Sequence, residues 1–365
     1  MLRCTRYDSL VFRNDGTIIA KYPFICYNIV IMEFQNDRKA AVKKLRLLTY
    51  NSKTNIDSFR QKMEEAYSTV FLPNGVERSE YKYGNIDCDI LAPEIYSSNR
   101  IMIYIHGGCF TGGSRKVYRA FCSSLATKCY CRVVIPEFRL APAYPCPAAI
   151  EDIQAVFRSL FTEEQISASL NSEKGATPKL PEIIIAADGS GATIACALLY
   201  NLRERYKSCI SHVVFFSPWL DLSPASRIMS AKKISDEVLN QDVFKKSATD
   251  YTYAENTKIS SVSPLLADDA QLEHFPPTFI QMGSKEILVD DAKQFAERLR
   301  AAGNVCELDI WKGMMYMFQM ADEFLHESHL ALDKVGKVVT QDNAGKESVE
   351  IENKPKLEHS LHSEA

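Results

Sequence analysis

One stretch of the chain has the composition of a tight turn that can present a reactive side chain. Ile183–Leu199 reads IIIAADGSGATIACALL: an apolar run breaks into Asp188-Gly189-Ser190-Gly191 and resumes as an Ala/Leu-rich segment. A short apolar run before a Gly-rich turn indicates a buried strand, and the segment after it favours a helix. Strand, tight turn and helix, with small residues at the bend, form the geometry of a nucleophile elbow. This bend is therefore the first candidate site.

A second candidate stretch is His106-Gly107-Gly108-Cys109-Phe110, which directly follows an apolar run. Its two glycines allow the backbone to turn and to present N–H groups to a ligand oxygen. The Cys109 thiol is a candidate nucleophile that would need a base or a positive field for activation; the alternative is a small apolar filler. We interpret His106 as a hydrogen-bonding residue of the loop rather than as a base.

The elements that must position these two stretches alternate regularly from about residue 76. Strands are expected at Tyr81–Leu91, Ile101–Ile105, Arg132–Pro136, Ile183–Ala187, His212–Ser217, Pro277–Met282 and Cys306–Trp311. Helices are expected at Tyr118–Ala126, Ala148–Phe161, Ala192–Leu199, Asp290–Ala302 and Ala321–Val339. This alternation predicts an α/β fold with a mostly parallel, doubly wound sheet, and Val/Ile-rich strands fit a sheet covered on both faces.

Three segments depart from the alternation and suggest the domain organisation. Residues 1–75 are interpreted as an N-terminal cap or lid, with a hairpin signal at Asn14-Asp15-Gly16 and helical spacing over Asp57–Val70. Residues 222–263, polar and helix-like, are interpreted as a lid insertion within an α/β domain of residues 76–340. Residues 341–365 contain too few apolar side chains to offset the entropy of ordering, which predicts a disordered tail.

Composition narrows the function further. The 365 residues carry a net charge of -3, which gives no reason to expect a nucleic acid or an anionic membrane as partner. The 11 cysteines lack the spacing of a metal site, so no metal or cofactor is expected. The apolar run Tyr22–Met32 is too short to span a bilayer, and no secretory signal is recognised. We therefore expect a cytoplasmic protein with free thiols.

The ordered motifs resemble the hormone-sensitive-lipase-like branch of the α/β-hydrolase superfamily. The matching blocks are His106–Phe110, Arg139-Leu140-Ala141-Pro142, Ser217–Ser223, Ser263-Pro264-Leu265-Leu266 and Gly283–Asp291, together with the elbow. They cover roughly residues 80–335 in the order of the family. The resemblance implies an α/β-hydrolase fold, a lid formed by the N-terminal segment and an insertion, and serine carboxylesterase or lipase activity on acyl esters. It also implies a possible homodimer through a surface helix.

The resemblance locates three triad-equivalent positions. The family's Gly-Asp-Ser-Ala-Gly-Gly elbow falls on residues 187–192, so that Gly189 occupies the position of the nucleophile. Small residues two positions before and after Gly189 agree with this register. Glu286 takes the position of the acid, where a carboxylate can still orient an imidazole. Tyr316 replaces the histidine, and a phenol with a pKa of about 10 is a poor base at neutral pH.

Three functions follow as hypotheses. The substituted triad predicts a catalytically impaired homologue, a pseudoenzyme that binds a small apolar or acyl ligand or a protein partner. Its binding residues would be His106, Gly107, Gly108, Cys109, Phe110, Asp188 and Ser190. The first alternative is an active carboxylesterase or lipase that uses Ser190 or Cys109 as a non-standard nucleophile. The second alternative is a structural or assembly protein.

Overall fold

The computed structural model describes residues 10–12, 18–20, 36–50, 53–67, 72–171, 180–230 and 236–341. The strands are β1 (Leu10–Phe12), β2 (Ile18–Ala20), β3 (Val76–Tyr83), β4 (Ile86–Pro93), β5 (Arg100–Ile105), β6 (Arg132–Pro136), β7 (Glu182–Asp188), β8 (Ile210–Phe216), β9 (Thr278–Gly283) and β10 (Cys306–Trp311). The main helices are α2 (Ile56–Tyr67), α3 (Arg115–Cys129), α4 (Ala148–Asn171), α5 (Gly189–Tyr200), α8 (Gln241–Tyr251), α10 (Val289–Ala301) and α11 (His326–Thr340). Shorter helical segments are η1 (Arg46–Leu48), α6 (Glu204–Lys207), α7 (Arg227–Ser230), η2 (Ala254–Lys258), η3 (Pro264–Leu266), α9 (Asp269–Leu272) and η4 (Phe318–Met320).

Eight strands form one mostly parallel sheet in the order β10-β9-β8-β7-β5-β6-β4-β3. The neighbours from β10 to β6 run parallel, whereas β4 is antiparallel to both β6 and β3. The elbow strand β7 lies at the centre, where both neighbours are paired and β7 is buried over Ile183–Asp188. The predicted α/β-hydrolase architecture is confirmed, and the site lies at the carboxyl end of its central strand.

The single strand expected over Tyr81–Leu91 is instead a hairpin. Strands β3 and β4 pair antiparallel, with Tyr83 opposite Ile86. The turn between them is Gly84-Asn85, both with positive φ (57° and 69°). A two-residue turn of this kind matches the twist of adjacent strands, which is why the apolar pattern continues across a reversal of the chain.

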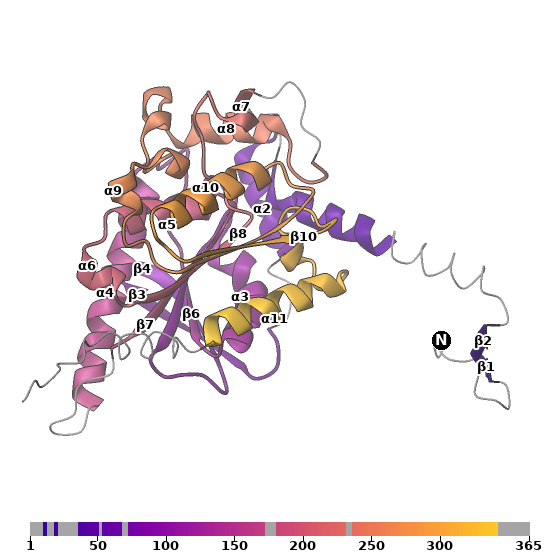
Figure 1. Ribbon diagram of the computed structural model, residues 1–365, viewed down its shortest axis with the longest axis horizontal. Helices are drawn as coiled ribbons and strands as arrows, with labels where there is room; N and C mark the ends of the chain where they lie inside the picture. The colour runs from indigo at the N-terminus through magenta and orange to yellow at the C-terminus, as the bar shows by residue number, and fades with distance from the viewer. Residues whose placement is uncertain are drawn as a thin grey trace, which may run out of the picture.

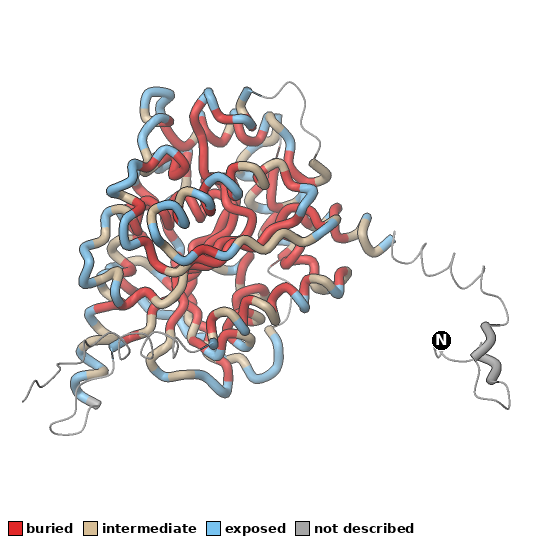
Figure 2. The backbone as a smooth tube through the Cα atoms, viewed as in Figure 1, coloured by how far each residue is buried: buried red, intermediate tan, exposed pale blue. Residues whose placement is uncertain are grey.

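Helices cover both faces of the sheet (Figure 1). On one face α3 packs against α11, and on the other α4 packs against α5 with α10 beside β9 and β10. Figure 2 shows the resulting buried core running through the sheet and its inner helical faces. The helix α5 is buried almost throughout because it lies between the sheet and its neighbouring helices. This burial fixes the direction from which α5 leaves the elbow.

The helix α2 of the N-terminal segment and the helices α7 and α8 of the insertion lie over the carboxyl end of the sheet (Figure 1). Arg38, on the helix over residues 36–45, donates to Glu237 at 2.6 Å, and the Tyr50 hydroxyl lies 3.0 Å from Ser247 Oγ. The predicted hairpin at the N-terminus is present as the antiparallel pair β1 and β2. The predicted boundaries of the domains stay predictions, and the predicted tail beyond residue 341 lies outside the described residues.

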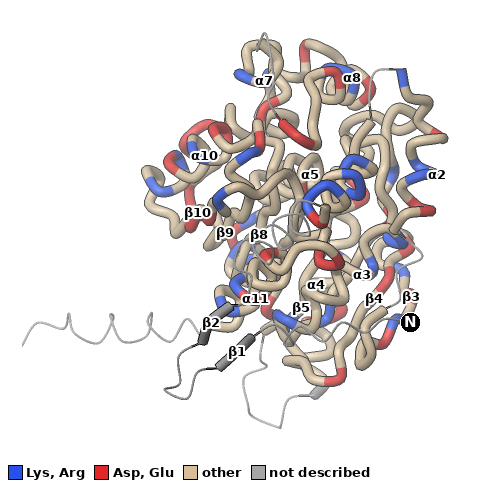
Figure 3. The backbone as a smooth tube through the Cα atoms, turned by 90° about the vertical axis from the view of Figure 1, so that its right-hand side faces the viewer, with Lys and Arg blue, Asp and Glu red and all other residues tan. Residues whose placement is uncertain are grey.

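The surface has no dominant sign of charge, because acidic and basic residues are interspersed along the described chain (Figure 3). Within the described ranges, no helix combines the length and apolar character needed to cross a membrane.

Candidate active site

The elbow joins β7 to α5 at Gly189. Asp188 is extended, Gly189 has a left-handed φ of 46°, and the helix begins directly at that residue. The backbone thus turns at Gly189, while Ser190 already lies within the first turn of α5. A side chain at Gly191 would collide with the carbonyl oxygen of Ile105, so the close packing of α5 against β5 requires glycine there. The structure accordingly has the turn of a nucleophile elbow, with glycine at its tip.

The Tyr316 side chain fills the space next to Gly189. A Cβ added at Gly189 would collide with the Tyr316 hydroxyl, which is the nearest atom to that position. Tyr316 is buried, and burial followed by the charge of Asp188 raises the pKa of its phenol well above the ordinary value. The phenol is therefore neutral and is a poor general base.

Glu286 reaches the Tyr316 loop through Ser217. The Ser217 hydroxyl donates to Glu286 Oε1 at 2.9 Å and accepts the N–H of Met317 at 3.4 Å. Glu286 Oε1 also accepts the N–H of Gly283, while Oε2 is buried and has no hydrogen-bond partner among the described residues. Burial raises the pKa of Glu286 well above its usual range. The carboxyl group thus braces the loop that carries Tyr316.

Asp188 holds three elements together beneath the elbow. Its carboxylate accepts the Tyr104 hydroxyl of β5 at 2.9 Å, the Tyr118 hydroxyl of α3 at 3.0 Å and the Gly107 N–H at 2.8 Å. Burial raises the pKa of Asp188 to about 6, although these three hydrogen bonds lower it. Asp188 is the helix N-cap, yet its side chain makes no capping hydrogen bond. Its role is to fix the glycine loop against the elbow.

The loop His106–Phe110 lies against the start of α5. Cys109 and Phe110 are both left-handed, with φ of 58° and 60°, a conformation that costs about 1–2 kcal/mol per residue. The Phe110 N–H donates to Ser190 Oγ at 3.0 Å. Within the described part of the chain, the N–H groups of Gly108 and Cys109 have no acceptor. These two amides and the first turn of α5 together can stabilise an oxyanion.

His106 supports this loop from within the core. Its Nδ1 lies 2.8 Å from the Gly107 carbonyl oxygen, and its ring stacks between Tyr118 and Phe138 at centroid distances of 5.3 and 4.3 Å. Burial lowers its pKa to about 4, so the imidazole is neutral at physiological pH. These contacts agree with the predicted role of His106 in loop structure.

Cys109 lies between the glycine loop and the segments above the sheet. Burial raises the pKa of its thiol to about 12, and the nearby hydroxyls of Ser247 and Thr49 oppose that rise. Thr49 and Tyr50 also line a cavity of about 380 Å³, whose other wall includes Val238 and Leu239. Thr49 thus connects the surroundings of the thiol with the lining of this cavity.

Aromatic side chains of the insertion pack against the loop His106–Phe110 and its neighbour Trp219. Tyr251 of α8 stacks on Phe110 with ring centroids 3.8 Å apart, and Phe244 of the same helix meets Trp219 edge-on at 4.9 Å. Trp219 in turn lies 5.3 Å from Phe110. The position of Phe110, and with it the strained loop, thus depends on α8.

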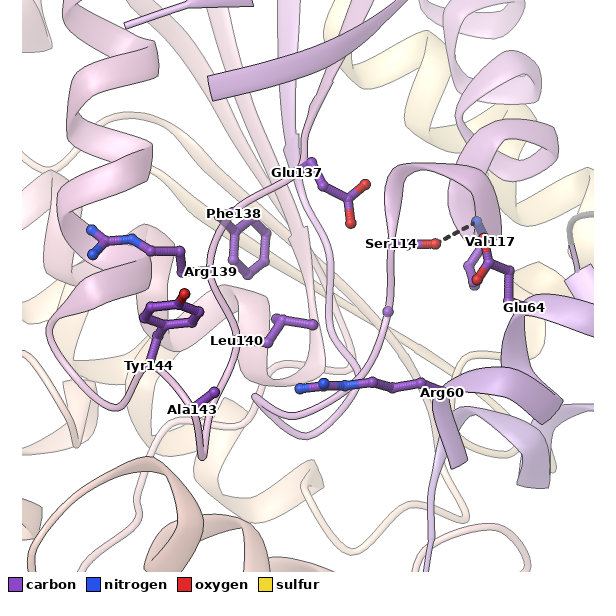
Figure 4. Close-up of a pocket in the computed structure, with 11 residues that line it drawn as sticks. Arg60, Glu64, Ser114, Val117, Glu137, Phe138, Arg139, Leu140, Ala143 and Tyr144 are labelled. Carbon is purple, nitrogen blue, oxygen red and sulfur yellow. Dashed lines mark hydrogen bonds between the residues drawn. The ribbon is translucent and has the colours of Figure 1, made fainter. Parts of the chain in front are cut away.

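The helix α2 of the N-terminal segment holds the other side of the loop. Arg60 Nε donates to the Thr111 carbonyl at 2.7 Å, and Nη2 donates to the Ala141 carbonyl at 3.0 Å. The Ala141 N–H donates to the Phe110 carbonyl at 3.1 Å. Figure 4 shows Arg60 at the edge of a cavity of about 320 Å³, opposite the Glu137 side chain. Arg60 therefore connects the N-terminal segment to the loop backbone.

The structure brings the predicted residues of the elbow, the glycine loop and the Tyr316 loop into one region. Sequence reasoning missed Ser217, Tyr104 and Tyr118, which bind the two carboxyl groups, and Arg60. Ser217 is the one residue of these with a local signal, since it ends the apolar run of β8. The others contact residues 51–84 positions away, a separation that no periodicity reveals.

Comparisons with known proteins agree with this fold and site. The family model described as alpha/beta hydrolase fold matches residues 102–320, and the chain belongs to that family. A protein of Acinetobacter venetianus named "Esterase" is 31% identical over 245 residues, which are 67% of this chain and 76% of that protein. A Streptomyces hygroscopicus protein named "Acetyl-hydrolase" is 27% identical over 273 residues, which are 75% of this chain and 85% of that one.

Solved structures show the same architecture. A hormone-sensitive lipase from a metagenome library superposes with a TM-score of 0.70 and 25% identity, covering 83% of this chain and 98% of that chain. An esterase from the bacterial hormone-sensitive lipase family gives a TM-score of 0.71 at 24% identity, covering 83% and 97%, and shows the shared fold alone.

These relatives contradict the predicted pseudoenzyme function. The similar proteins are named esterase and acetyl-hydrolase. The prediction rested on the side chains at three positions, Gly189, Glu286 and Tyr316. Substitution at those positions does not prevent a neighbouring residue from acting as the nucleophile. The backbone amides that stabilise an oxyanion need no particular side chain. The findings favour the alternative, an active esterase.

Proposed function

We propose that the protein is a carboxylic ester hydrolase that acts on short acyl esters. The observation that carries the proposal is the 31% identical relative named "Esterase", whose similarity covers 67% of this chain and 76% of that protein. The free N–H groups of Gly108 and Cys109 beside the start of α5 support it, because a tetrahedral intermediate needs such donors. The cavity of about 380 Å³ beyond Thr49 has the size of a small-ligand pocket.

Cys109 is the first candidate for the nucleophile. Its thiol lies beside Thr49 of the cavity wall, whereas the Ser190 hydroxyl is turned toward the loop, where it accepts the Phe110 N–H. The Cys109 thiolate would attack the ester carbonyl, and the negative charge would move to the carbonyl oxygen. The thiol proton goes to solvent when the thiolate forms, and collapse of this intermediate breaks the C–O bond and expels the alkoxide, which takes a proton from water. Water then attacks the thioester and breaks the C–S bond, which releases the carboxylic acid and returns the Cys109 thiol. Ser190 is the second candidate.

Hydrolysis of p-nitrophenyl acetate and butyrate tests the proposal. We expect turnover by the wild type and its loss in Cys109→Ala, with Ser190→Ala retaining activity. Cys306→Ala is the matched control, because Cys306 has the same exposed fraction as Cys109, 8%, but lies at the start of β10. Loss in Ser190→Ala alone would assign the serine instead. Absence of turnover in the purified wild type would refute the proposed function.

The pH dependence separates the two nucleophiles. Since the pKa of the Cys109 thiol is raised to about 12 by burial, the thiolate fraction increases about tenfold per pH unit well below that value. We expect the rate with p-nitrophenyl acetate, corrected for spontaneous hydrolysis, to rise accordingly between pH 7 and pH 10. A rate that reaches a plateau below pH 9 would contradict Cys109 as the nucleophile.

Location and organisation complete the proposal. A cytoplasmic location is supported by nine described cysteines that are all free thiols. The N-terminal segment and the insertion are proposed to act as a lid, which is supported by their joint contact with the glycine loop through Arg60 and Tyr251. Homodimer formation stays a prediction.

A further inference from the structure

A groove on the insertion lies outside the candidate active site. It is bounded by α7, α8 and η2 and has a volume of about 540 Å³. Its apolar walls include Leu222, Met229, Ala248 and Tyr253, and Tyr253 is 77% exposed. No lining residue belongs to the elbow, the glycine loop or the Tyr316 loop. An apolar hollow of this size with few polar groups has the character of a small-molecule site.

The helix α8 separates this groove from the glycine loop. Lys245, Ala248 and Thr249 lie on one face of the helix and line the groove. Phe244 and Tyr251 of the same helix pack on Trp219 and Phe110 and do not line the groove. The spacing of Lys245, Ala248 and Thr249, three and four residues apart, follows from 3.6 residues per turn. The groove and the candidate active site therefore share the helix α8 but no lining residue.

Lys245 supplies the groove with a positive charge. It is exposed, and within the described ranges it takes part in no ion pair, in contrast to its neighbour Lys246, which binds Asp250 at 2.9 Å. Thr249 stands beside it, with its hydroxyl donating to the Lys245 carbonyl at 3.0 Å. A ligand that fits this groove has an apolar chain and one negative group at its end.

We propose that the groove binds the carboxylate of a medium-chain fatty acid, with the chain against Leu222, Met229 and Ala248 and the carboxylate at Lys245. The charge complementarity selects an anionic amphiphile over a neutral or cationic one of the same length. The binding site does not depend on the proposed esterase activity, because none of its residues takes part in that reaction.

Titration calorimetry with decanoate, 1-decanol and decyltrimethylammonium tests the site on the full chain. We expect one decanoate per chain and weaker binding of the alcohol and the cation. Lys245→Glu should weaken decanoate about threefold to tenfold, because an exposed ion pair contributes up to about 1 kcal/mol and the reversal adds repulsion. The control Lys258→Glu makes the same charge change on an exposed residue of η2 outside the lining and should leave the affinity unchanged.

Two filling variants test the apolar part of the groove. Ala248→Phe and Thr249→Trp should each abolish decanoate binding, and Thr249 is exposed, so its replacement does not disturb the core. Measured melting curves identify any variant that is unfolded. The proposal is overturned if decanoate binds no better than decanol, if Thr249→Trp binds normally, or if Lys258→Glu weakens binding as much as Lys245→Glu. Decanoate that binds only in the candidate active site would keep its affinity in Ala248→Phe and Thr249→Trp, which overturns the proposal.

Discussion

The contact between Gly189 and Tyr316 gives the sharpest prediction about the elbow. Replacing Gly189 by Ala adds one Cβ where the backbone is left-handed, which costs about 1–2 kcal/mol. The same atom collides with the Tyr316 hydroxyl, and overpacking of a core typically costs about 1–3 kcal/mol. We therefore expect Gly189→Ala to lower the free energy of unfolding by about 2–5 kcal/mol.

Tyr316→Phe separates these two costs. It removes the colliding oxygen, and the next atom of the ring, Cζ, would lie 3.5 Å from the added Cβ, an ordinary van der Waals contact. The double variant should therefore keep only the backbone cost. Urea unfolding of the wild type, both single variants and the double variant should give a coupling free energy of about 1–3 kcal/mol.

Gly303→Ala is the matched control for the backbone. Gly303 has a φ of 82°, and nothing lies within 4 Å of a Cβ added there. Its replacement should cost about 1–2 kcal/mol and show no coupling to Tyr316→Phe. If the Gly189 and Tyr316 substitutions add within about 0.5 kcal/mol, the hydroxyl does not occupy this space and the reasoning fails.

The remaining predictions concern the same region. Gly189→Ser combined with Tyr316→His should raise ester hydrolysis at pH 7 at least 100-fold, because loss of a serine or its histidine costs on the order of 10⁶ in kcat. Arg60→Gln should lower kcat about tenfold with a smaller change in KM, because it removes two charge-assisted hydrogen bonds to the loop carbonyls. Asp188 has a pKa raised by burial from 3.8 to about 6, so the folded state binds more protons than the unfolded state between these values. The contribution of Asp188 to the free energy of unfolding, on the order of 3 kcal/mol, is present below pH 4 and is lost as the pH rises to 6–7. Urea unfolding of the wild type and of Asp188→Asn at pH 4 and at pH 7 measures this contribution.

Each of these predictions has an opposing outcome. The double substitution at the elbow is refuted if hydrolysis does not exceed that of the wild type while the melting curve remains cooperative. If Arg60→Gln and Arg60→Lys lower kcat equally and lower the thermal stability equally, the two hydrogen bonds of the Arg60 guanidinium have no specific role in placing the loop. If wild type and Asp188→Asn show the same change in unfolding free energy between pH 4 and pH 7, the carboxyl group does not titrate in that range.

The sequence by itself determined the order of strands and helices, the elbow at residues 188–191 and the glycine loop after β5. These features are local, since period-two and apolar runs define strands and glycines mark turns. The hairpin β3–β4 was missed although Gly84-Asn85 is a two-residue turn signal, because the apolar pattern alone was followed there. The family resemblance also followed from sequence, whereas the predicted loss of activity is contradicted by relatives named esterase and acetyl-hydrolase.

Only the tertiary structure decided what surrounds these motifs. It set the Tyr316 hydroxyl against Gly189, tied Asp188 to two tyrosines and placed Cys109 beside Thr49. These partners come from elements far apart in the chain, and they meet because parallel strands bring their carboxyl ends to one edge of the sheet. Burial at that edge raises the pKa of the Cys109 thiol and of the Asp188 carboxyl above the ordinary values of these two residue types. A sequence names the side chains, but their environment exists only after the chain has folded.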